Sequence, residues 1–234
     1  MQIPVLIYHK IDFLPSDVRI RGAFTSPRRF AKQIAYLKKK EFDFYTVSEL
    51  VNFYKNNGKF PPKGIALTFD DGWEDNYTNA FPVLQKFGVK ATIFLVSSCI
   101  GQTSAKVTPE GEGARAHLSQ MQILEMSQYG IEFGSHSSNH KLFNRISTEE
   151  IELEVRESKS YIENLLQKEC SVFAYPAGFY TEAAKKIIKN SGYNAAFSTV
   201  YGANDDIDLY AINRVEILRR DGYPFQFAKK IKSL

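Results

Sequence analysis

The segment GIALTFDDG, from Gly64 to Gly72, places two adjacent carboxylates at the end of an apolar run. A short apolar run bounded by glycine is typical of a buried β-strand. Neighbouring side chains on a strand point to opposite faces of the sheet, so Asp70 and Asp71 share one surface only if the chain turns at once. Gly72 permits the backbone conformations of such a turn. The segment therefore predicts a strand that ends by presenting two carboxylates.

Similar apolar runs alternate with amphipathic patterns along the rest of the chain. Strands are expected at 3–9, 90–98, 131–136, 171–176, 193–199 and 210–217, and helices at 26–40, 47–58, 76–87, 119–130, 181–192, from Ser147, and from about Pro224. Repeated strand-then-helix order with apolar strands indicates a parallel sheet covered by helices. Seven or eight such units favour a closed α/β barrel over an open sheet. We therefore expect residues 1–234 to form one α/β barrel domain.

The composition excludes several function classes. The 234 residues are 44% hydrophobic and carry a net charge of only +4, which is typical of a globular protein. The one basic run, Lys38–Lys40, fits the solvated end of a helix, so no nucleic-acid partner is expected. The glycine-rich signatures of dinucleotide and P-loop sites do not occur.

The sequence also bears on compartment. Cys99 and Cys170 form no disulfide framework and no C-x-x-C motif. The first residues lack the order of a secretory signal, and no apolar run approaches the roughly 18 residues of a membrane span. We expect a cytoplasmic protein as the sequence stands, or an extracellular or cell-envelope protein if a leader has been removed.

Chemistry in an α/β barrel lies at the carboxyl ends of the strands. The expected strand ends carry His9, the Asp70–Asp71 pair, and the histidines of HSSNH, His136 and His140. The His-x-x-x-His spacing lets both imidazoles reach one ion. Adding Asp71 gives two nitrogen ligands and one oxygen ligand with a position left for water, which is the pattern of a catalytic metal site. Asp70 would then face that water as a base.

These motifs resemble a known family. TFDDG (68–72) followed by HSSNH (136–140) is similar to the polysaccharide deacetylases, the NodB-homology enzymes of carbohydrate esterase family 4. IPVLIYH (3–9) before LTFDDG, with FAYPAG (173–178) as a third motif, resembles more narrowly the biofilm poly-N-acetylglucosamine deacetylases, whose motif order is permuted. The resemblance covers nearly the whole chain and implies an irregular seven-stranded barrel.

The resemblance implies a role for each residue. Asp70 would be the catalytic base, and Asp71, His136 and His140 would bind a divalent metal, usually zinc. The backbone N–H of Ala177 would stabilise the oxyanion. The implied reaction is hydrolysis of the N-acetyl group of N-acetylhexosamine units in a glycan, with release of acetate.

The chain departs from the family pattern in three places. Ala174 stands where the third motif commonly has an arginine, no Asp-Trp motif is present late in the chain, and no histidine follows His140. The catalytic acid is therefore His9 or His117. We favour His9, which ends an apolar strand and matches an early histidine of the biofilm enzymes, and expect His117 to be exposed. Arg214 could replace the missing guanidinium or form an ordinary rim salt bridge.

Weaker features leave alternatives open. Trp73 and Tyr77 could stack on a sugar ring or simply pack in the core. The glycine-rich loop 101–117 could border a substrate groove or be merely mobile. Two other functions also fit. One is a metal-dependent hydrolase of another amide or of an O-acetyl ester, and the other is a glycan-binding homologue that has lost turnover.

Overall fold

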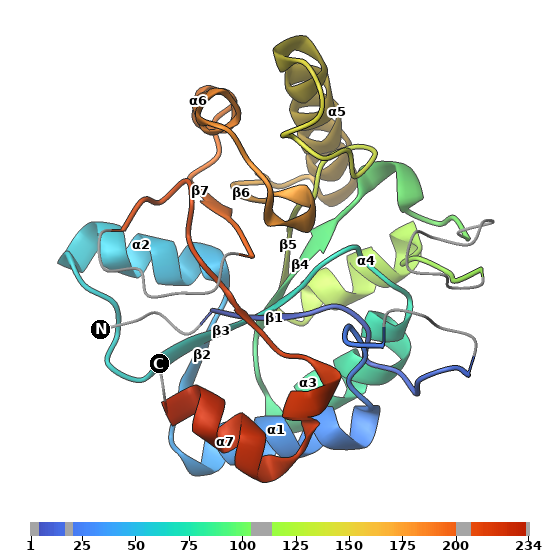
Figure 1. Cartoon of the computed structure of the whole chain (residues 1–234), viewed down its shortest axis with the longest axis vertical. Coiled ribbons are helices and arrows are strands. Elements are labelled where there is room, and N and C mark those ends of the chain that lie inside the picture. The colour runs from blue at the N-terminus through green and yellow to red at the C-terminus, as the bar shows by residue number, and fades with distance from the viewer. Residues whose placement is uncertain (1–4, 17–20, 104–113, 200–206, 233–234) are drawn as a thin grey trace.

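The described residues of the computed structural model, 5–16, 21–103, 114–199 and 207–232, contain one curled sheet of parallel strands (Figure 1). Seven strands follow the order β7-β6-β5-β4-β3-β1-β8, and β2 pairs with β3 outside that path. The predicted α/β barrel is confirmed, with an irregular wall. The strands are β1 (Val5–Tyr8), β2 (Asp43–Tyr45), β3 (Gly64–Phe69), β4 (Ala91–Leu95), β5 (Ile131–Ser135), β6 (Val172–Ala174), β7 (Ala195–Phe197) and β8 (Val215–Glu216).

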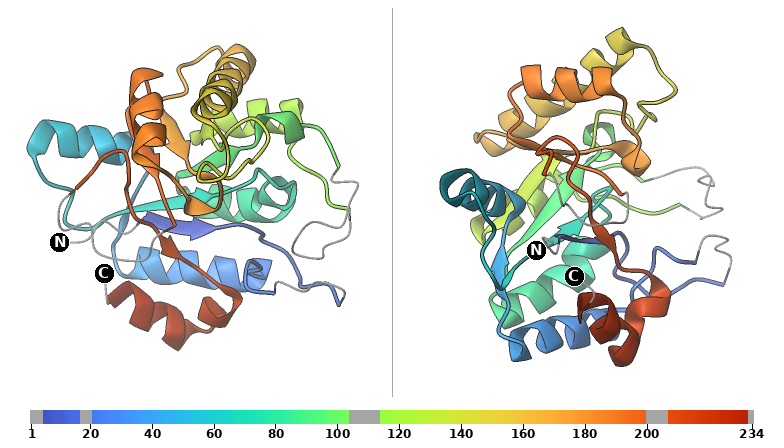
Figure 2. Two further views of the ribbon diagram at one scale, coloured as in Figure 1. Left: turned by 45° about the horizontal axis from the view of Figure 1, so that its top comes forward. Right: turned by 60° about the vertical axis from the view of Figure 1, so that its left-hand side comes forward.

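Among the described residues, all helices but one pack on the outer face of this sheet. The helices are α1 (Pro27–Lys39), α2 (Val47–Asn57), α3 (Phe81–Phe87), α4 (Gln120–Gln128), α5 (Thr148–Leu166), α6 (Glu182–Asn190) and α7 (Pro224–Lys232). A π-helix, η1 (Asn76–Ala80), leads into α3, and 3₁₀ turns η2 (Ser97–Cys99), η3 (Pro176–Gly178) and η4 (Arg219–Gly222) follow β4, β6 and β8. Helices α1 and α7 lie side by side on one flank, and α5 and α6 lie on the other (Figure 2).

The two faces of the sheet carry separate apolar layers. Because alternate residues of a strand point to opposite faces, Ala66 and Phe94 pack on the inner face with Leu50 of α2. Leu67 and Ile93 pack on the outer face in the larger cluster beneath the other helices. Helix α2 thus covers the inner face near the start of β3, and the carboxyl ends of the strands are left for the site.

The segment before β8 links the two edges of the sheet. Ile212 exchanges backbone hydrogen bonds with β7, donating to Ala196 and accepting from Ser198, at 2.9 and 2.8 Å. Five residues later, Ile217 donates to Ile7 of β1 at 2.9 Å. The strand expected over 210–217 is therefore wrong in length, because this segment pairs first with one edge and then with the other. This crossing places the buried side chain of Arg214 beside Thr68 of β3.

Local sequence signals set several element ends. The Ser147 hydroxyl accepts from the Glu150 N–H, and the Glu150 carboxylate accepts from the Ser147 N–H, which is the expected capping box. Gly58 ends α2 at φ 66°. The sequence missed β2 because three residues are too short to show a period. Part of the expected strand 3–9 lies outside the described residues, and within them no helix is long and apolar enough to cross a bilayer.

Candidate active site and metal centre

The turn after β3 brings the two carboxylates onto one surface. Asp70 is two residues beyond Thr68 and points with it into the barrel, so Asp71 would face outward if the strand continued. Instead Asp71 and Gly72 adopt φ values of 73° and 68°, which reverse the chain. The positive φ of Gly72 favours glycine, and a Cβ there would lie 2.7 Å from the Leu95 side chain, which would have to move. The backbone conformation at Asp71 and Gly72 thus explains how two adjacent aspartates can lie on one surface.

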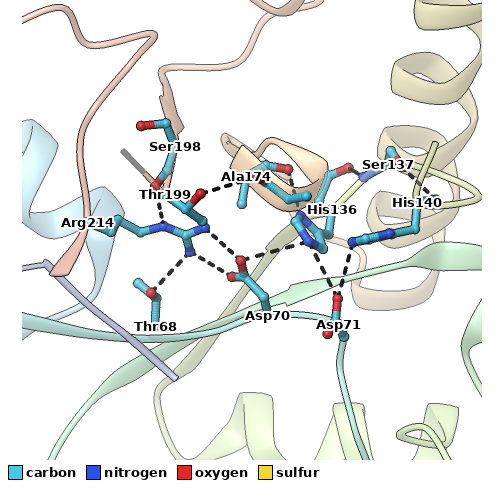
Figure 3. Close-up of polar contacts among 12 residues, drawn as sticks. Thr68, Asp70, Asp71, His136, Ser137, His140, Ala174, Ser198, Thr199 and Arg214 are labelled. Atoms are coloured by element: carbon cyan, nitrogen blue, oxygen red, sulfur yellow. Dashed lines mark hydrogen bonds and ion pairs between the residues drawn. The ribbon is translucent and has the colours of Figure 1, made fainter. Parts of the chain in front are cut away.

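The two histidines come from the loop after β5. His136 is buried, and its Nδ1 lies 2.8 Å from the backbone carbonyl oxygen of Ala174, which leaves Nε2 to face the carboxylates (Figure 3). A metal-binding histidine typically donates its other N–H in this way, which fixes the ring and the tautomer. Ser137 and His140 both have positive φ, and the Ser137 hydroxyl accepts from the His140 N–H at 3.0 Å. This tight turn directs His140 back toward Asp71.

Asp71, His136 and His140 form a ligand set of the right size for one ion. Oδ1 of Asp71 lies 3.6 Å from His136 Nε2 and 3.5 Å from His140 Nε2. Ligand atoms about 2.0–2.1 Å from a tetrahedral zinc ion lie roughly 3.3 Å from one another. The three donor atoms lie within 4.8 Å of each other, so a small shift would close the set around a divalent metal. These residues therefore form a candidate metal centre.

The ionisation of these groups suits metal binding. Burial alone would raise the pKa of Asp71, but the charges of His140 and His136 outweigh it and hold that pKa well below its usual range. Burial lowers the pKa of His136 to about 4, despite the opposing charge of Asp70. At neutral pH the site therefore holds an ionised carboxylate and a neutral imidazole, the forms that ligate a metal.

Asp70 is held by Arg214 and not by the histidines. Nη1 and Nη2 of Arg214 donate to Oδ1 and Oδ2 of Asp70, each at 2.7 Å, while His136 Nε2 lies 3.8 Å away (Figure 3). Arg214 also donates to the Ser198 carbonyl oxygen at 3.0 Å and to the Thr68 hydroxyl at 3.2 Å. Both partners of the ion pair are buried. Burial would raise the pKa of Asp70, and Arg214, together with the charges of His136 and His9, more than offsets that effect.

Trp73 and His117 support the other oxygen and the backbone of Asp71. The indole Nε1 of Trp73 donates to Asp71 Oδ2 at 2.9 Å, so Oδ1 is the oxygen left to face the histidines. The His117 ring stacks on Trp73 with centroids 4.2 Å apart, and its Nδ1 lies 3.1 Å from the Asp71 carbonyl oxygen. The expected exposure of His117 is wrong, because its loop pairs with Trp73 in an antiparallel bridge.

The side chain of Trp73 is only 6% exposed, so it packs in the core and is not available to stack on a sugar ring. Tyr77 is half-buried, and its hydroxyl donates to Glu125 at 2.7 Å. The loop expected to border a groove falls largely on 104–113, outside the described residues. The hydrogen bond from Trp73 to Asp71 was not predicted, and the position of Trp73 two residues after Asp71 is the signal that could have suggested it.

His9 precedes the candidate metal ligands in the sequence, and Ala177 follows them. His9 follows β1, its carbonyl oxygen accepts from the Asn76 side chain at 3.0 Å, and its charge is one of those that lower the pKa of both aspartates against the effect of burial. Ala177 lies in η3 at φ 51°, exposed, and its carbonyl oxygen accepts from the Thr199 hydroxyl at 3.2 Å. Both residues therefore belong to the same rim of the barrel as the ligands.

The parallel barrel and the carboxylate–histidine cluster at its carboxyl rim define an α/β-barrel hydrolase. The chain belongs to the polysaccharide deacetylase family, whose model matches residues 57–196. It is 30% identical to YxkH of Bacillus subtilis, a protein assigned to the polysaccharide deacetylases, over 92% of this chain and 71% of that protein. It is also 30% identical to the poly-β-1,6-N-acetyl-D-glucosamine N-deacetylase of Staphylococcus epidermidis, over 88% of this chain and 72% of that enzyme.

A solved structure agrees with this assignment. The deacetylase PplD of Streptococcus pyogenes, determined in complex with acetate, superposes with a TM-score of 0.83 over 98% of each chain, at 27% identity. The family resemblance drawn from TFDDG and HSSNH, including the likeness to the poly-N-acetylglucosamine deacetylases, is therefore confirmed. The chain is a polysaccharide deacetylase by family.

Proposed function

We propose that this protein removes the N-acetyl group from N-acetylhexosamine units of a glycan by a metal-dependent hydrolysis. The observation that carries the proposal is the division of labour between two adjacent carboxylates. Asp71 directs one oxygen toward His136 and His140, whereas both oxygens of Asp70 are held by Arg214 beside them. Named relatives that act on poly-β-1,6-N-acetyl-D-glucosamine support the choice of substrate class.

Asp71, His136 and His140 would hold the metal, most simply Zn²⁺, which suits two imidazoles and a carboxylate. When bound, the ion lowers the pKa of a water and polarises the acetyl carbonyl. Asp70 accepts the proton of the attacking water, because it is ionised and Arg214 fixes its orientation. Arg214 would thereby replace the guanidinium that Ala174 cannot supply.

Two further groups complete the proposed reaction. The backbone N–H of Ala177 donates to the acetyl oxygen as negative charge develops there. Protonated His9 donates its proton to the nitrogen that leaves, so that the C–N bond breaks to a free amine and not to an amide anion. Acetate and a free amino sugar are the products.

The direct test is acetate release from a panel of N-acetylated and O-acetylated oligosaccharides, with and without a chelator. We expect release from acetylated chito-oligosaccharides or poly-N-acetylglucosamine fragments, lost on chelation and restored by Zn²⁺. Release only from O-acetyl esters or small amides would favour the alternative hydrolase. Binding of the same sugars with no acetate release at any metal load would favour a glycan-binding protein without turnover.

A separate prediction concerns His9. His9→Ala should strongly lower turnover on an N-acetyl amine, because an amine leaves poorly without a proton. It should affect an aryl acetate much less, because a phenolate leaves unassisted. The measurement is kcat on both substrates, with metal analysis of the same preparations.

His117→Ala is the matched control, because His117 is a second histidine near Asp71 that packs on Trp73. The His117→Ala variant should change kcat on the N-acetyl amine and on the aryl acetate by the same factor. Equal losses on amide and ester in His9→Ala would show that His9 is structural. A leaving-group dependence in His117→Ala alone would transfer the acid role to that residue.

A further inference from the structure

A pocket rich in arginine lies on the same rim as the site and has no part in the proposed chemistry. It has a volume of about 380 Å³ and is lined by Arg21, Gly22, Arg29, Leu218, Arg219, Arg220 and Tyr223. Four of these residues are arginines, and no acidic side chain lines the pocket within the described residues. Positive charges gathered along one small space repel one another, and an anion bound among them relieves that repulsion. The pocket therefore has the charge of an oxyanion-binding site.

Three separate segments contribute these arginines. Arg21 lies in the connection after β1, Arg29 in the first turn of α1, and the remaining pair in η4 after β8. A hydrogen bond from the Arg219 N–H to the Gly22 carbonyl oxygen, 2.8 Å long, joins two of these segments. The pocket is therefore fixed by tertiary structure and is not a chance run of charge along one helix.

The guanidinium of Arg29 is held in place. Its Nη1 lies 3.4 Å from the Arg219 carbonyl oxygen, and its Cζ lies over the Tyr223 ring at 4.5 Å from the centroid. A Cβ at Gly222 would lie only 2.5 Å from the Cδ of Arg29, so glycine at that position leaves the space in which the side chain lies. A planar guanidinium fixed in this way loses little freedom when it binds a carboxylate or phosphate.

The charge at the start of α1 is opposite to the usual preference. Acidic residues are favoured in the first turn of a helix, where the backbone presents partial positive charge. The first turn of α1 has no acidic residue and contains Arg28 and Arg29. The nearest acidic group on η4, Asp221, already pairs with Lys230 at 2.7 Å and accepts from the Leu218 N–H at 2.9 Å. Within the described residues, the charge of the pocket is therefore left for an external anion.

Strand register places this pocket beside the proposed site. Ile7 of β1 is level with Glu216 of β8, so His9, two residues after Ile7, is level with Leu218. Both β1 and β8 run parallel, and their carboxyl ends open on the same rim. A polymer that presents an acetylated sugar to the site could pass over the pocket on the His9 side.

We propose that this arginine pocket binds an oxyanion group, a phosphate or a carboxylate, carried by the glycan substrate. The proposal rests on the proposed function, since it names a feature of the polymer that the site would deacetylate. Guanidinium groups bind both oxyanions in paired hydrogen bonds, so the pocket would favour acidic glycans over neutral ones. It would thus act as a specificity site outside the catalytic residues.

Binding is tested first, with three probes and a neutral control. The probes are a phosphodiester-linked glycerol oligomer, an oligogalacturonate and inorganic phosphate, and the control is a chito-oligosaccharide. Arg219→Ala/Arg220→Ala should weaken binding of at least one polymer about tenfold or more. The polymer that responds identifies the source of the oxyanion. Arg28→Ala is the matched variant, because Arg28 is an exposed arginine of the same helix turn as Arg29 and does not line the pocket.

Equal polymer binding by the wild type and the double variant would overturn the proposal. An equal loss in Arg28→Ala would do the same, because it would indicate diffuse charge attraction. Binding of inorganic phosphate without either polymer would also overturn it. Melting temperatures of both variants should match the wild type, since Arg219 and Arg220 are exposed.

Activity provides the second arm. With an N-acetylated oligosaccharide that carries the responsive oxyanion, the double variant should raise KM about tenfold and leave kcat unchanged. With a neutral chito-oligosaccharide neither constant should change. If the wild type releases acetate from no glycan, the proposed function fails, whereas the binding result is unaffected. If KM for the acidic substrate is unchanged while acetate release persists, the pocket has no role in specificity.

Discussion

Asp70→Asn should lower turnover by roughly 10²–10⁴-fold, the usual range for loss of a positioned general base. The amide cannot accept the proton of the attacking water, yet it keeps one oxygen for the hydrogen bond from Arg214. Metal content should be unchanged, because Asp70 lies outside the set formed by Asp71 and the two histidines. The measurements are kcat for acetate release and metal analysis of the same preparation.

Asp70→Asn should also lower the stability of the fold. The substitution leaves Arg214 buried opposite a neutral group, and breaking a buried ion pair on one side destabilises a protein by about 3–5 kcal/mol. Asp70→Asn/Arg214→Met removes the buried charge on both sides and should recover much of the melting temperature. Turnover should remain low in this double variant. Recovery of activity along with stability would show that Asp70 acts on the fold and not on the reaction.

Asp71→Ala and His136→Ala should each abolish tight metal binding, and acetate release should fall to background. Each removes one of three protein ligands, and the remaining two hold a divalent ion weakly. Metal analysis after dialysis and kcat at saturating Zn²⁺ measure the effect. Full metal retention in both variants would exclude the proposed ligand set.

Trp73→Phe offers a graded control for the same site. It keeps an aromatic ring against His117 and removes the hydrogen bond to Asp71 Oδ2. We expect metal affinity to fall by about 10–100-fold, as for other residues that hydrogen-bond to metal ligands.

The roles of the two carboxylates can also be tested against each other. If Asp70→Asn lost metal and Asp71→Asn kept it, the roles of the two carboxylates would be reversed.

The sequence predicted the barrel and the positions of the charged residues with good accuracy, for a simple reason. Strand ends are marked by a change from apolar to polar residues, and parallel strands bring those ends to one rim. Asp70, Asp71, His136 and His140 could therefore be placed together before any contact was known. The family motifs narrowed the chemistry in the same way.

Contacts that depend on tertiary structure were harder to foresee. The carbonyl oxygen of Ala174 orients His136, and no side-chain pattern reports a backbone acceptor. Arg214 approaches Asp70 across 144 positions of sequence, so the sequence left two possibilities open for it, a partner of Asp70 or a rim salt bridge, and only the path of the segment between β7 and β8 decides between them. His117 was misjudged because its polar neighbours indicate exposure, whereas the bridge to Trp73 buries it.

The backbone of the site has a consequence for how the protein tolerates change. Asp71, Ser137, His140 and Ala177 all have positive φ without being glycine. A left-handed conformation costs such residues about 1–2 kcal/mol each. The loops that contain them keep this conformation only because the surrounding barrel stabilises it. Variants that weaken the wall of the barrel should therefore release these loops first. On heating, activity would be lost at a lower temperature than the sheet itself.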